Sequence, residues 1–239
     1  MSNELLWLLF ALVNFSLIVG MYKLFGKTGL FAWIAMGTIL ANIQVTKSID
    51  FTVGNFVIAA TLGNIMYGTL FLVTDALGEK YGKKDAKKAV YIGFFSLVAT
   101  VIVMQFALLF EPNAFDFAHD SLTVIFGFLP RLALASLTAY AVSQLFDVYF
   151  FQRIKERFDS DKTLWIRNNG STIVSQLLDS ILFVPIAFAP IVIFGAEGLP
   201  WDIVWEIFWT TYVIKVIVAA LDTPFVYLIK RIQPLEETI

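Results

Sequence analysis

The sequence predicts an all-α integral membrane protein, a bundle of about seven transmembrane helices that forms a single domain over residues 1–239. Hydrophobic residues make up 59% of the chain and charged residues only 15%, whereas an ordinary soluble domain has about 25% charged residues. Seven apolar stretches are each long enough to cross a bilayer as a helix. Basic residues gather in alternate linkers, which predicts an N-terminus outside the cell membrane and a C-terminus inside.

The apolar stretches are expected to be helices because a helix satisfies its own backbone hydrogen bonds in lipid. The first stretch has neither a basic segment before it nor a small-residue cleavage site after it, which is typical of a retained helix and not of a signal peptide. The expected transmembrane helices are 5–22, 30–46, 52–77, 89–110, 122–150, 165–194 and 203–229.

The orientation follows from the lysines and arginines. The linkers after the first, third, fifth and seventh stretches hold fourteen of the 17 basic residues, whereas the other linkers hold one, Lys47, among several acids. Because basic linkers stay in the cytoplasm, the first set is assigned to the inside. The linker 152–164 alternates charged and apolar residues, and we expect it to lie along the inner membrane surface as a short amphipathic helix.

The stretch 165–194 carries a carboxylate, Asp179, near its midpoint. Ser171, Ser175 and Gln176 precede it by eight, four and three residues and therefore share its helical face. An ionised aspartate at the centre of a bilayer costs roughly 2.5–3.5 kcal/mol on insertion scales, so this face is expected to meet protein or water. It is either a hydrogen-bonded seam between helices or a polar pocket for a solute.

Other polar side chains also fall inside the predicted helices. Lys215 lies near the midplane, as does Asn64, and Phe71 and Asp75 share the helical face of Asn64. Because such groups are costly in lipid, we expect them to converge on the inside of the bundle. Three acids near the cytoplasmic helix ends are expected to reach water, namely Asp75, Asp147 and Asp222. The other intramembrane polar residues are Arg131, Gln144 and Glu206.

Two short segments of the chain resemble each other. Residues 142–147 read Val-Ser-Gln-Leu-Phe-Asp, and residues 174–179 read Val-Ser-Gln-Leu-Leu-Asp. The two predicted helices run in opposite directions, and inverted repeats are common in transporters. Six residues are too few to establish a duplication, so chance or a shared packing need is the favoured interpretation.

Several function classes lack the residues they need. The chain has no cysteine and one histidine, His119, so neither a metal nor another cofactor is expected. No Walker loop, His-Glu motif or nucleophile elbow occurs, and we expect no enzyme. A retinal pigment needs a carboxylate beside its lysine, but Thr211 precedes Lys215 by one turn. A purely structural bundle stays open, although it explains poorly why polar groups reach the midplane.

Several short motifs follow one another in a fixed order along most of the chain. They are Ala41-Asn42-Ile43, Thr74-Asp75 through Glu79 to Gly82, Pro130-Arg131, Gln144-Leu-Phe-Asp147, Gly170-Ser171-Thr172, Gln176-Leu-Leu-Asp179, Lys215-Val216 and Thr223-Pro224. In this order and spacing they resemble the queuosine precursor transporter family, formerly called vitamin uptake transporters. The family often has glycine where this chain has Ser143 and Ser175. Many members carry a glutamate where Ala219 stands, whereas Asp222 is an acid not expected there.

The resemblance implies a transporter that imports 7-deazaguanine bases: 7-cyano-7-deazaguanine, 7-aminomethyl-7-deazaguanine or queuine. Such a base presents two adjacent N–H donors that one carboxylate accepts, which suits Asp179. Its carbonyl oxygen suits Lys215, Arg131 or Gln176. The rest of the expected substrate site is Asn64 and Gln144 for the ring nitrogens, Ser171 on the face of Asp179, and Tyr67 and Phe71 as stacking walls. The expected gate or coupling residues are Asp75, Glu79, Asp147 and Asp222.

Asp75 and Glu79 precede the basic run Lys80–Lys88, so they would either latch cytoplasmic loops or form a cytoplasmic gate. Two other functions stay open: a substrate-capture subunit of an ATPase-energised vitamin or nucleobase importer, and a receptor that binds without translocating. The expected partners are a deazapurine solute and the lipid bilayer, with no nucleic acid. The sequence leaves open whether the chain forms a homodimer, which precursor it prefers, and which ion, if any, is coupled.

Overall fold

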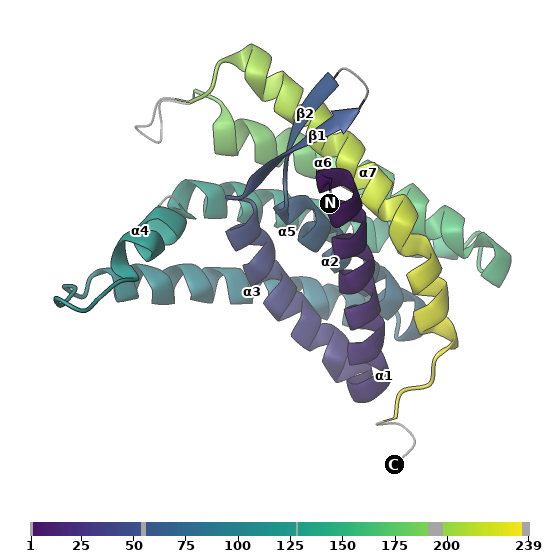
Figure 1. Ribbon diagram of the computed structural model, residues 1–239. Coiled ribbons are helices and arrows are strands. Elements are labelled where there is room, and N and C mark those ends of the chain that lie inside the picture. The colour runs from purple at the N-terminus through teal and green to yellow at the C-terminus, as the bar shows by residue number, and fades with distance from the viewer. Residues whose placement is uncertain (1, 54–55, 128, 191–197, 236–239) are drawn as a thin grey trace.

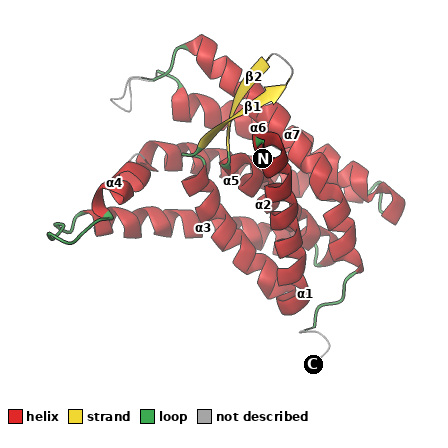
Figure 2. Cartoon of the chain, viewed as in Figure 1, coloured by secondary structure: helices red, strands yellow, loops and turns green. Residues whose placement is uncertain are grey.

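The computed structural model describes residues 2–53, 56–127, 129–190 and 198–235. These residues form seven α-helices, a short 3-10 helix and one two-stranded antiparallel sheet (Figures 1 and 2). The elements are α1 (Asn3–Gln44), β1 (Ser48–Val53), β2 (Phe56–Thr61), α2 (Gly63–Lys80), α3 (Lys83–Leu108), α4 (His119–Gly127), α5 (Leu129–Lys155), the 3-10 helix η1 (Asp161–Thr163), α6 (Leu164–Phe188) and α7 (Trp201–Arg231).

Five of the described helices, α1, α3, α5, α6 and α7, are long and apolar enough to cross a membrane. Their outward faces carry exposed large apolar side chains, for example Phe95 at 73%, Phe106 at 65% and Trp209 at 57% exposure. Apolar surface on this scale suits contact with lipid. The prediction of a helical membrane protein is therefore confirmed at the level of fold class.

Helix α1 is bent back on itself at Gly26, so the predicted helices 5–22 and 30–46 form its two limbs (Figure 1). Gly26 has φ 52° and ψ −138°, a backbone conformation that residues with a Cβ atom avoid. Both ends of α1 lie beside the β-hairpin, where the Asn3 side chain donates a 2.9 Å hydrogen bond to the carbonyl of Asp50.

The predicted helix 52–77 is wrong at its beginning, because β1 and β2 form a hairpin there and α2 starts only at Gly63. Phenylalanine and β-branched residues fill these strands, and such residues favour strand over helix. The two strands are separated in sequence by Gly54 and Asn55, a pair that favours hairpins and that lies outside the described residues. The two strands pair their facing backbone groups, and side chains of α1 bond two of the outward-facing ones, because Glu4 accepts from the Thr52 N–H at 2.6 Å and Asn3 donates to the Asp50 carbonyl.

Two predictions around α5 are also wrong. The stretch 122–150 begins in a separate short helix, α4, which ends at Gly127, and α5 starts two residues later. The linker 152–164 forms no amphipathic helix, because α5 continues to Lys155 and the chain turns through η1 directly into α6. Arg167 of α6 holds this turn by donating to two of its backbone carbonyls.

Helix α6 ends at Phe188, before the predicted end at residue 194. Ala189 is extended, with ψ 154°, because a following proline disfavours helical geometry, and Pro190 follows it. The predicted end itself falls in 191–197, outside the described residues.

The start of α1 lies beside the hairpin, and α7 ends at the opposite end of the molecule, which we call the C-terminal end (Figure 1). At this C-terminal end the chain returns to α1, where Leu235 N–H donates to the Lys23 carbonyl and Lys23 Nζ donates to the Gln233 carbonyl, both at 2.9 Å. Lys80 Nζ donates to the carbonyl of Ile229 at 3.2 Å. Nearly all of α2 is buried, so α2 forms the centre of the bundle.

Candidate functional site

Helices α2, α5, α6 and α7 carry polar side chains into the core in three layers, in the same order on every helix. On α2 the layers are marked by Tyr67, Asp75 and Glu79, which span about 18 Å at 1.5 Å per residue. We name the layers, from the hairpin end, the Asp179 cluster, the carboxylate cluster and the Glu79 network. The Asp179 cluster consists of Tyr67, Ser143, Asp179 and Lys215. The carboxylate cluster consists of Asp75, Asp147 and Asp222. The Glu79 network consists of Glu79, Lys155, Asp161, Arg167 and Lys230.

The Asp179 cluster contains a buried ion pair. Asp179 Oδ2 pairs with Lys215 Nζ, and the two side chains are 2% and 3% exposed. Asp179 Oδ1 accepts hydrogen bonds from the Tyr67 hydroxyl at 2.9 Å and the Ser143 hydroxyl at 3.1 Å. The Tyr67 ring also lies 5.2 Å from Lys215 Nζ and 5.9 Å from the ring of Phe71. Both charges are thus paired, as buried charges must be.

A cavity of about 30 Å³ lies beside Asp179, between the end of α1 and the start of α2. Asn42 Oδ1 and Asn64 Nδ2 are buried and have no hydrogen-bond partner among the described residues. Small-molecule pockets usually measure about 300–1,000 Å³, so this cavity must widen before it can hold a solute. Its polar lining residues are Asn42, Asn64, Tyr67, Ser136, Asp179 and Lys215.

The structure gathers four of the predicted substrate residues, Asp179, Lys215, Asn64 and Tyr67, around this cavity. Arg131 lies elsewhere. It donates to the carbonyls of Ile186, at 2.9 Å, and Ala189. These carbonyls belong to the C-terminal end of α6, where a cation is favourable because the helix leaves acceptors unpaired and has a negative end.

Three other predicted residues do not line the cavity. Gln144 Oε1 accepts from the Thr74 hydroxyl at 3.2 Å. The Ser171 hydroxyl donates to a carbonyl of its own helix at 3.2 Å. Gln176 is 1% exposed, and neither end of its amide has a hydrogen-bond partner among the described residues. A buried amide in this condition is costly, and Gln176 is therefore the clearest candidate for a group that bonds a solute.

The two six-residue segments that resemble each other are joined by reciprocal hydrogen bonds. Ser143 of α5 donates to Asp179 of α6 at 3.1 Å, and Ser175 of α6 donates to Asp147 of α5 at 2.8 Å. The donors are the two serines at positions where the family often has glycine. The similarity of the two segments therefore corresponds to the same serine-to-aspartate contact between α5 and α6, which occurs once in each of two layers.

The acids of the carboxylate cluster are buried, so the expectation that they reach water is wrong. Asp75, Asp147 and Asp222 are 2%, 0% and 2% exposed, because α6 covers them with its polar face. Within the described residues no ion pair joins any of them to a lysine or arginine. Two ionised groups 4 Å apart at an effective dielectric constant of 20 repel by about 4 kcal/mol. The hydroxyl and amide groups of α6 that bond these acids are Thr172 to Asp75 (3.4 Å), Ser175 to Asp147 (2.8 Å) and Asn168 to Asp222 (3.1 Å).

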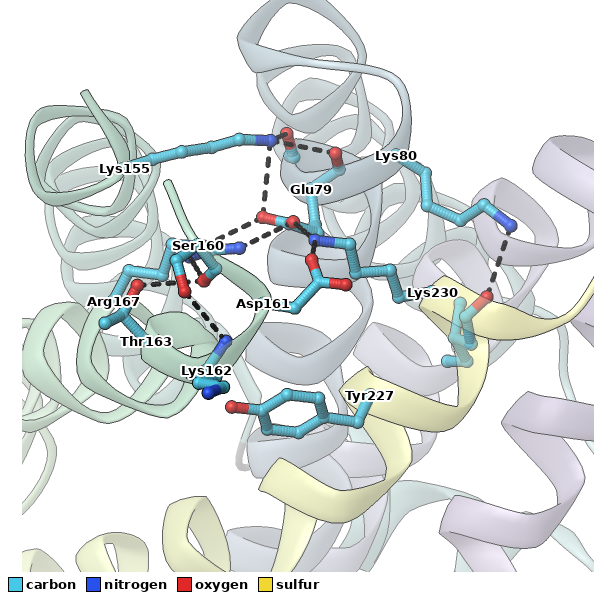
Figure 3. Close-up of polar contacts among 12 residues, drawn as sticks. Glu79, Lys80, Lys155, Ser160, Asp161, Lys162, Thr163, Arg167, Tyr227 and Lys230 are labelled. Carbon is cyan, nitrogen blue, oxygen red and sulfur yellow. Dashed lines mark hydrogen bonds and ion pairs between the residues drawn. The ribbon is translucent and has the colours of Figure 1, made fainter. Parts of the chain in front are cut away.

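The Glu79 network joins α2 to α5, α6 and α7 (Figure 3). Glu79, whose side chain is 2% exposed, receives both arms of the Arg167 guanidinium at 2.9 and 2.6 Å. Lys155 Nζ lies 3.2 Å from Glu79, and Lys230 pairs with both Glu79 and Asp161. A carboxylate held in this two-armed way is strongly oriented.

The partners of Glu79 that the structure describes come from α5, α6 and α7 and not from the run Lys80–Lys88, which follows Glu79 in the sequence. Lys80 binds carbonyls at the end of α7, and Lys83 Nζ lies 4.7 Å from the ring centre of Tyr149. Asp75 and Glu79, which were predicted as a pair, lie in different layers, because Asp75 belongs to the carboxylate cluster.

Sequence reasoning missed the α6 residues Asn168 and Thr172. Together with Ser175 and Asp179 they recur at intervals of four, three and four residues, so they form one continuous polar stripe. That spacing, read along the whole helix, would have identified them.

Comparison with known proteins identifies the family of the chain. A family described as "Putative vitamin uptake transporter" matches residues 61–229. The "Probable queuosine precursor transporter" of Bacillus subtilis (strain 168) is 46% identical over 237 residues, which cover 99% of each chain. The "Queuosine precursor transporter" of Escherichia coli (strain K12) is 25% identical over 158 residues, covering 65% of this chain and 67% of that one. No solved structure matches. The chain therefore belongs to the queuosine precursor transporter family, a family of membrane transporters and not of enzymes.

Proposed function

We propose that this protein imports queuosine precursors, 7-deazaguanine bases such as 7-cyano-7-deazaguanine, 7-aminomethyl-7-deazaguanine or queuine, across the cell membrane into the cytoplasm. The observation that carries the proposal is the buried Asp179–Lys215 pair beside a cavity in the bundle core. An intramembrane ion pair facing a cavity is typical of a solute pathway. Relatives of the chain are named queuosine precursor transporters.

The chain crosses the membrane seven times in this proposal. The two limbs of α1 supply two crossings, α2 with its hairpin a third, and α3, α5, α6 and α7 the other four. The hairpin end is outside and the C-terminal end inside. Support comes from the basic residues Lys23, Lys80, Lys155 and Lys230, whose contacts all lie at the C-terminal end, as positive residues on the cytoplasmic side require.

Asp179 binds the base by exchanging partners. Both of its oxygens are occupied by Tyr67, Ser143 and Lys215. When the cavity widens, the two N–H donors of the guanine-like edge replace the two hydroxyl donors, and Lys215 turns toward the carbonyl oxygen of the base. Gln176 then satisfies its amide on the base as well. This exchange leaves the carboxylate and the ammonium group each hydrogen-bonded to the base, so neither buried charge is left without a polar partner.

The Glu79 network closes the inner end of the pathway. Glu79 draws α5, α6 and α7 together through Lys155, Arg167 and Lys230, so the inner ends of these helices separate only if those contacts break. The small volume of the cavity beside Asp179 supports this proposal, because a base could enter or leave only after the helices around it move apart.

Uptake of a labelled base by the purified protein in liposomes tests the proposal. We expect wild-type protein to take up the base and Asp179→Asn to lose uptake. Asp202→Asn, which changes an exposed aspartate on α7, serves as the matched control and keeps full uptake. Uptake without any added ATPase also excludes the substrate-capture subunit. Binding with no uptake by the wild type would contradict import and favour a capture subunit or a receptor.

A further inference from the structure

Five acidic side chains lie in the buried core of α2, α5, α6 and α7, and they differ in how they are paired. Asp179 pairs with Lys215, and Glu79 pairs with Arg167 and two lysines. The three acids of the carboxylate cluster form no ion pair within the described residues. The cluster therefore needs another source of positive charge.

Two buried oxygen atoms in this cluster lack a donor among the described residues: Oδ2 of Asp147 and Oδ1 of Asn168. Both residues are 0% exposed, and Asn168 points into the cluster because its Nδ2 donates to Asp222 at 3.1 Å. Asp75 and Asp147 are neighbours in this cluster, because their hydrogen-bond donors Thr172 and Ser175 lie three residues apart on α6. Two neighbouring carboxyl groups can form a hydrogen bond with each other only when one of them carries a proton. A proton supplies the donor that Asp147 lacks.

We propose that the carboxylate cluster is the proton-binding site of this transporter, with the proton shared between Asp75 and Asp147, and that this proton moves inward with each base. The proposal rests on the transport function proposed above. Three uncompensated carboxylates in a buried site would repel one another. Loading a proton removes part of that repulsion, so the loaded cluster is the more compact one.

The charged groups that flank the cluster are already engaged with other partners. On the hairpin side Asp179 holds Lys215, and the Tyr67 hydroxyl donates to Asp179. On the other side the cations of the Glu79 network hold Glu79. The helices α1 and α3, which also pack on α2, contribute the pair Lys27–Asp85 at 3.2 Å. No member of these pairs neutralises the carboxylate cluster in the part of the chain that the structure describes.

The proton site and the base site share one helix interface. Ser175 bonds Asp147 in the carboxylate cluster, and Ser143 bonds Asp179 in the next layer. Each serine lies one turn from the aspartate of its own helix. A shift of α6 along α5 therefore changes both contacts together. Binding of the base to Asp179, which displaces Ser143, is coupled through this shift to proton binding at Asp147.

Infrared spectroscopy and vesicle transport test the proposal separately. The carbonyl stretch of a protonated carboxyl group differs from that of a carboxylate, so a buried protonated acid is visible in the purified protein at neutral pH. We expect this band in wild-type protein and its loss in Asp147→Asn. Asp75→Asn is a second variant of the same pair. Asp159→Asn changes an exposed acid and serves as the matched control, which keeps the band. Only variants that remain monodisperse in detergent are compared.

In liposomes with a pH difference, one proton per neutral base supports about tenfold accumulation for each pH unit. We expect wild-type protein and Asp159→Asn to accumulate the base under this gradient, and Asp147→Asn to exchange labelled for unlabelled base without accumulating it. Three outcomes would overturn the proposal: no protonated-carboxyl band in the wild type, a band unchanged in both variants, or accumulation that follows a sodium gradient at equal pH. Wild-type exchange would still support import in all three cases, so the two proposals fail separately.

Discussion

Ser143 of α5 donates a hydrogen bond of 3.1 Å to Asp179 of α6, and the same contact recurs in reverse between Ser175 and Asp147 at 2.8 Å. In this chain the α5–α6 interface is therefore fixed by two hydrogen bonds that a glycine could not make. This gives the closed arrangement extra stability relative to any state in which α5 and α6 shift.

Replacing Ser143 by alanine is expected to weaken the closed state without weakening the bound state. One lost hydrogen bond costs about 0.5–1.5 kcal/mol, which lowers the midpoint of thermal unfolding. Because the base replaces Ser143 on Asp179, its affinity should stay unchanged or rise several-fold, as measured by equilibrium binding. Ser180→Ala removes a buried hydroxyl that has no partner among the described residues and should change neither quantity. A large loss of affinity in Ser143→Ala would place this serine in contact with the base.

Single and double variants of Asp179 and Lys215 distinguish a structural role of this ion pair from a role in binding the base. Breaking a buried pair by removing one partner costs about 3–5 kcal/mol, so Asp179→Asn and Lys215→Met should each lower stability. The double variant should recover stability, because it leaves neither charge alone. We expect it not to recover binding, since Asp179 contacts the base in the proposed site, and affinity should stay at least about tenfold reduced, a change of about 1.4 kcal/mol.

The measurement is binding of labelled base by variants that run as a single species in detergent. Normal transport by Asp179→Asn combined with Lys215→Met would show that the pair is scaffold and that the base binds elsewhere.

Glu79→Gln is expected to loosen the inner end of the bundle. The variant leaves Arg167, which is 0% exposed, beside a neutral amide, together with Lys155 and Lys230. Labelling of a cysteine introduced near the inner ends of α5 or α6 should become faster from the cytoplasmic side. Glu156→Gln is the matched control, because the pair Arg153–Glu156 is exposed and surface pairs contribute little. Equal labelling in the two variants would show that the network does not close the pathway.

The topology is tested by single cysteines, because the chain has none of its own. Cysteines at Lys83 and Lys88 should react with a membrane-impermeant reagent only from the cytoplasm, and a cysteine at Asp116 only from outside. The readout is labelling of intact cells compared with inverted membranes. Labelling of all three positions from one side would rule out the seven-crossing arrangement.

Gly26→Ala should destabilise the bend in α1. The positive φ at Gly26 places a residue with a Cβ in a region that costs about 1–3 kcal/mol. Gly20→Ala lies in the same limb, where an added Cβ meets nothing within 4 Å, and should be neutral or stabilising by up to about 1 kcal/mol. Thermal unfolding in detergent distinguishes the two. Equal midpoints would mean that the bend tolerates a side chain.

Polarity and length were enough to predict the class of the fold, because lipid imposes both on any membrane helix. They were not enough to predict the hairpin, since 52–61 is as apolar as a helix, and only its strand-forming residues and the Gly54–Asn55 pair favoured another structure. Asp179 and Lys215 were placed together correctly because both lie near the midplane. Arg131 was grouped with them wrongly, because depth along a helix does not show which neighbour a side chain meets.

The burial of Asp75, Asp147 and Asp222 also could not be read from depth alone. Position near a helix end suggested access to water. What covers them is the polar stripe of α6, which begins at Asn168, and its effect depends on how four helices are arranged around each other. The reciprocal serines likewise follow from the packing of α5 on α6.

The contacts at the C-terminal end set the order in which the molecule can be assembled. Lys80 of α2 binds the carbonyls of Ile229 and Ile232, and Lys23 of α1 binds Gln233. These acceptors are synthesised after α1 and α2, so α1 and α2 enter the membrane before their partners exist. The cations of α1 and α2 stay in the aqueous interface until α7 has been made. The central helix of the bundle, α2, is therefore made before α7 and gains its contacts at the C-terminal end only when α7 is in place.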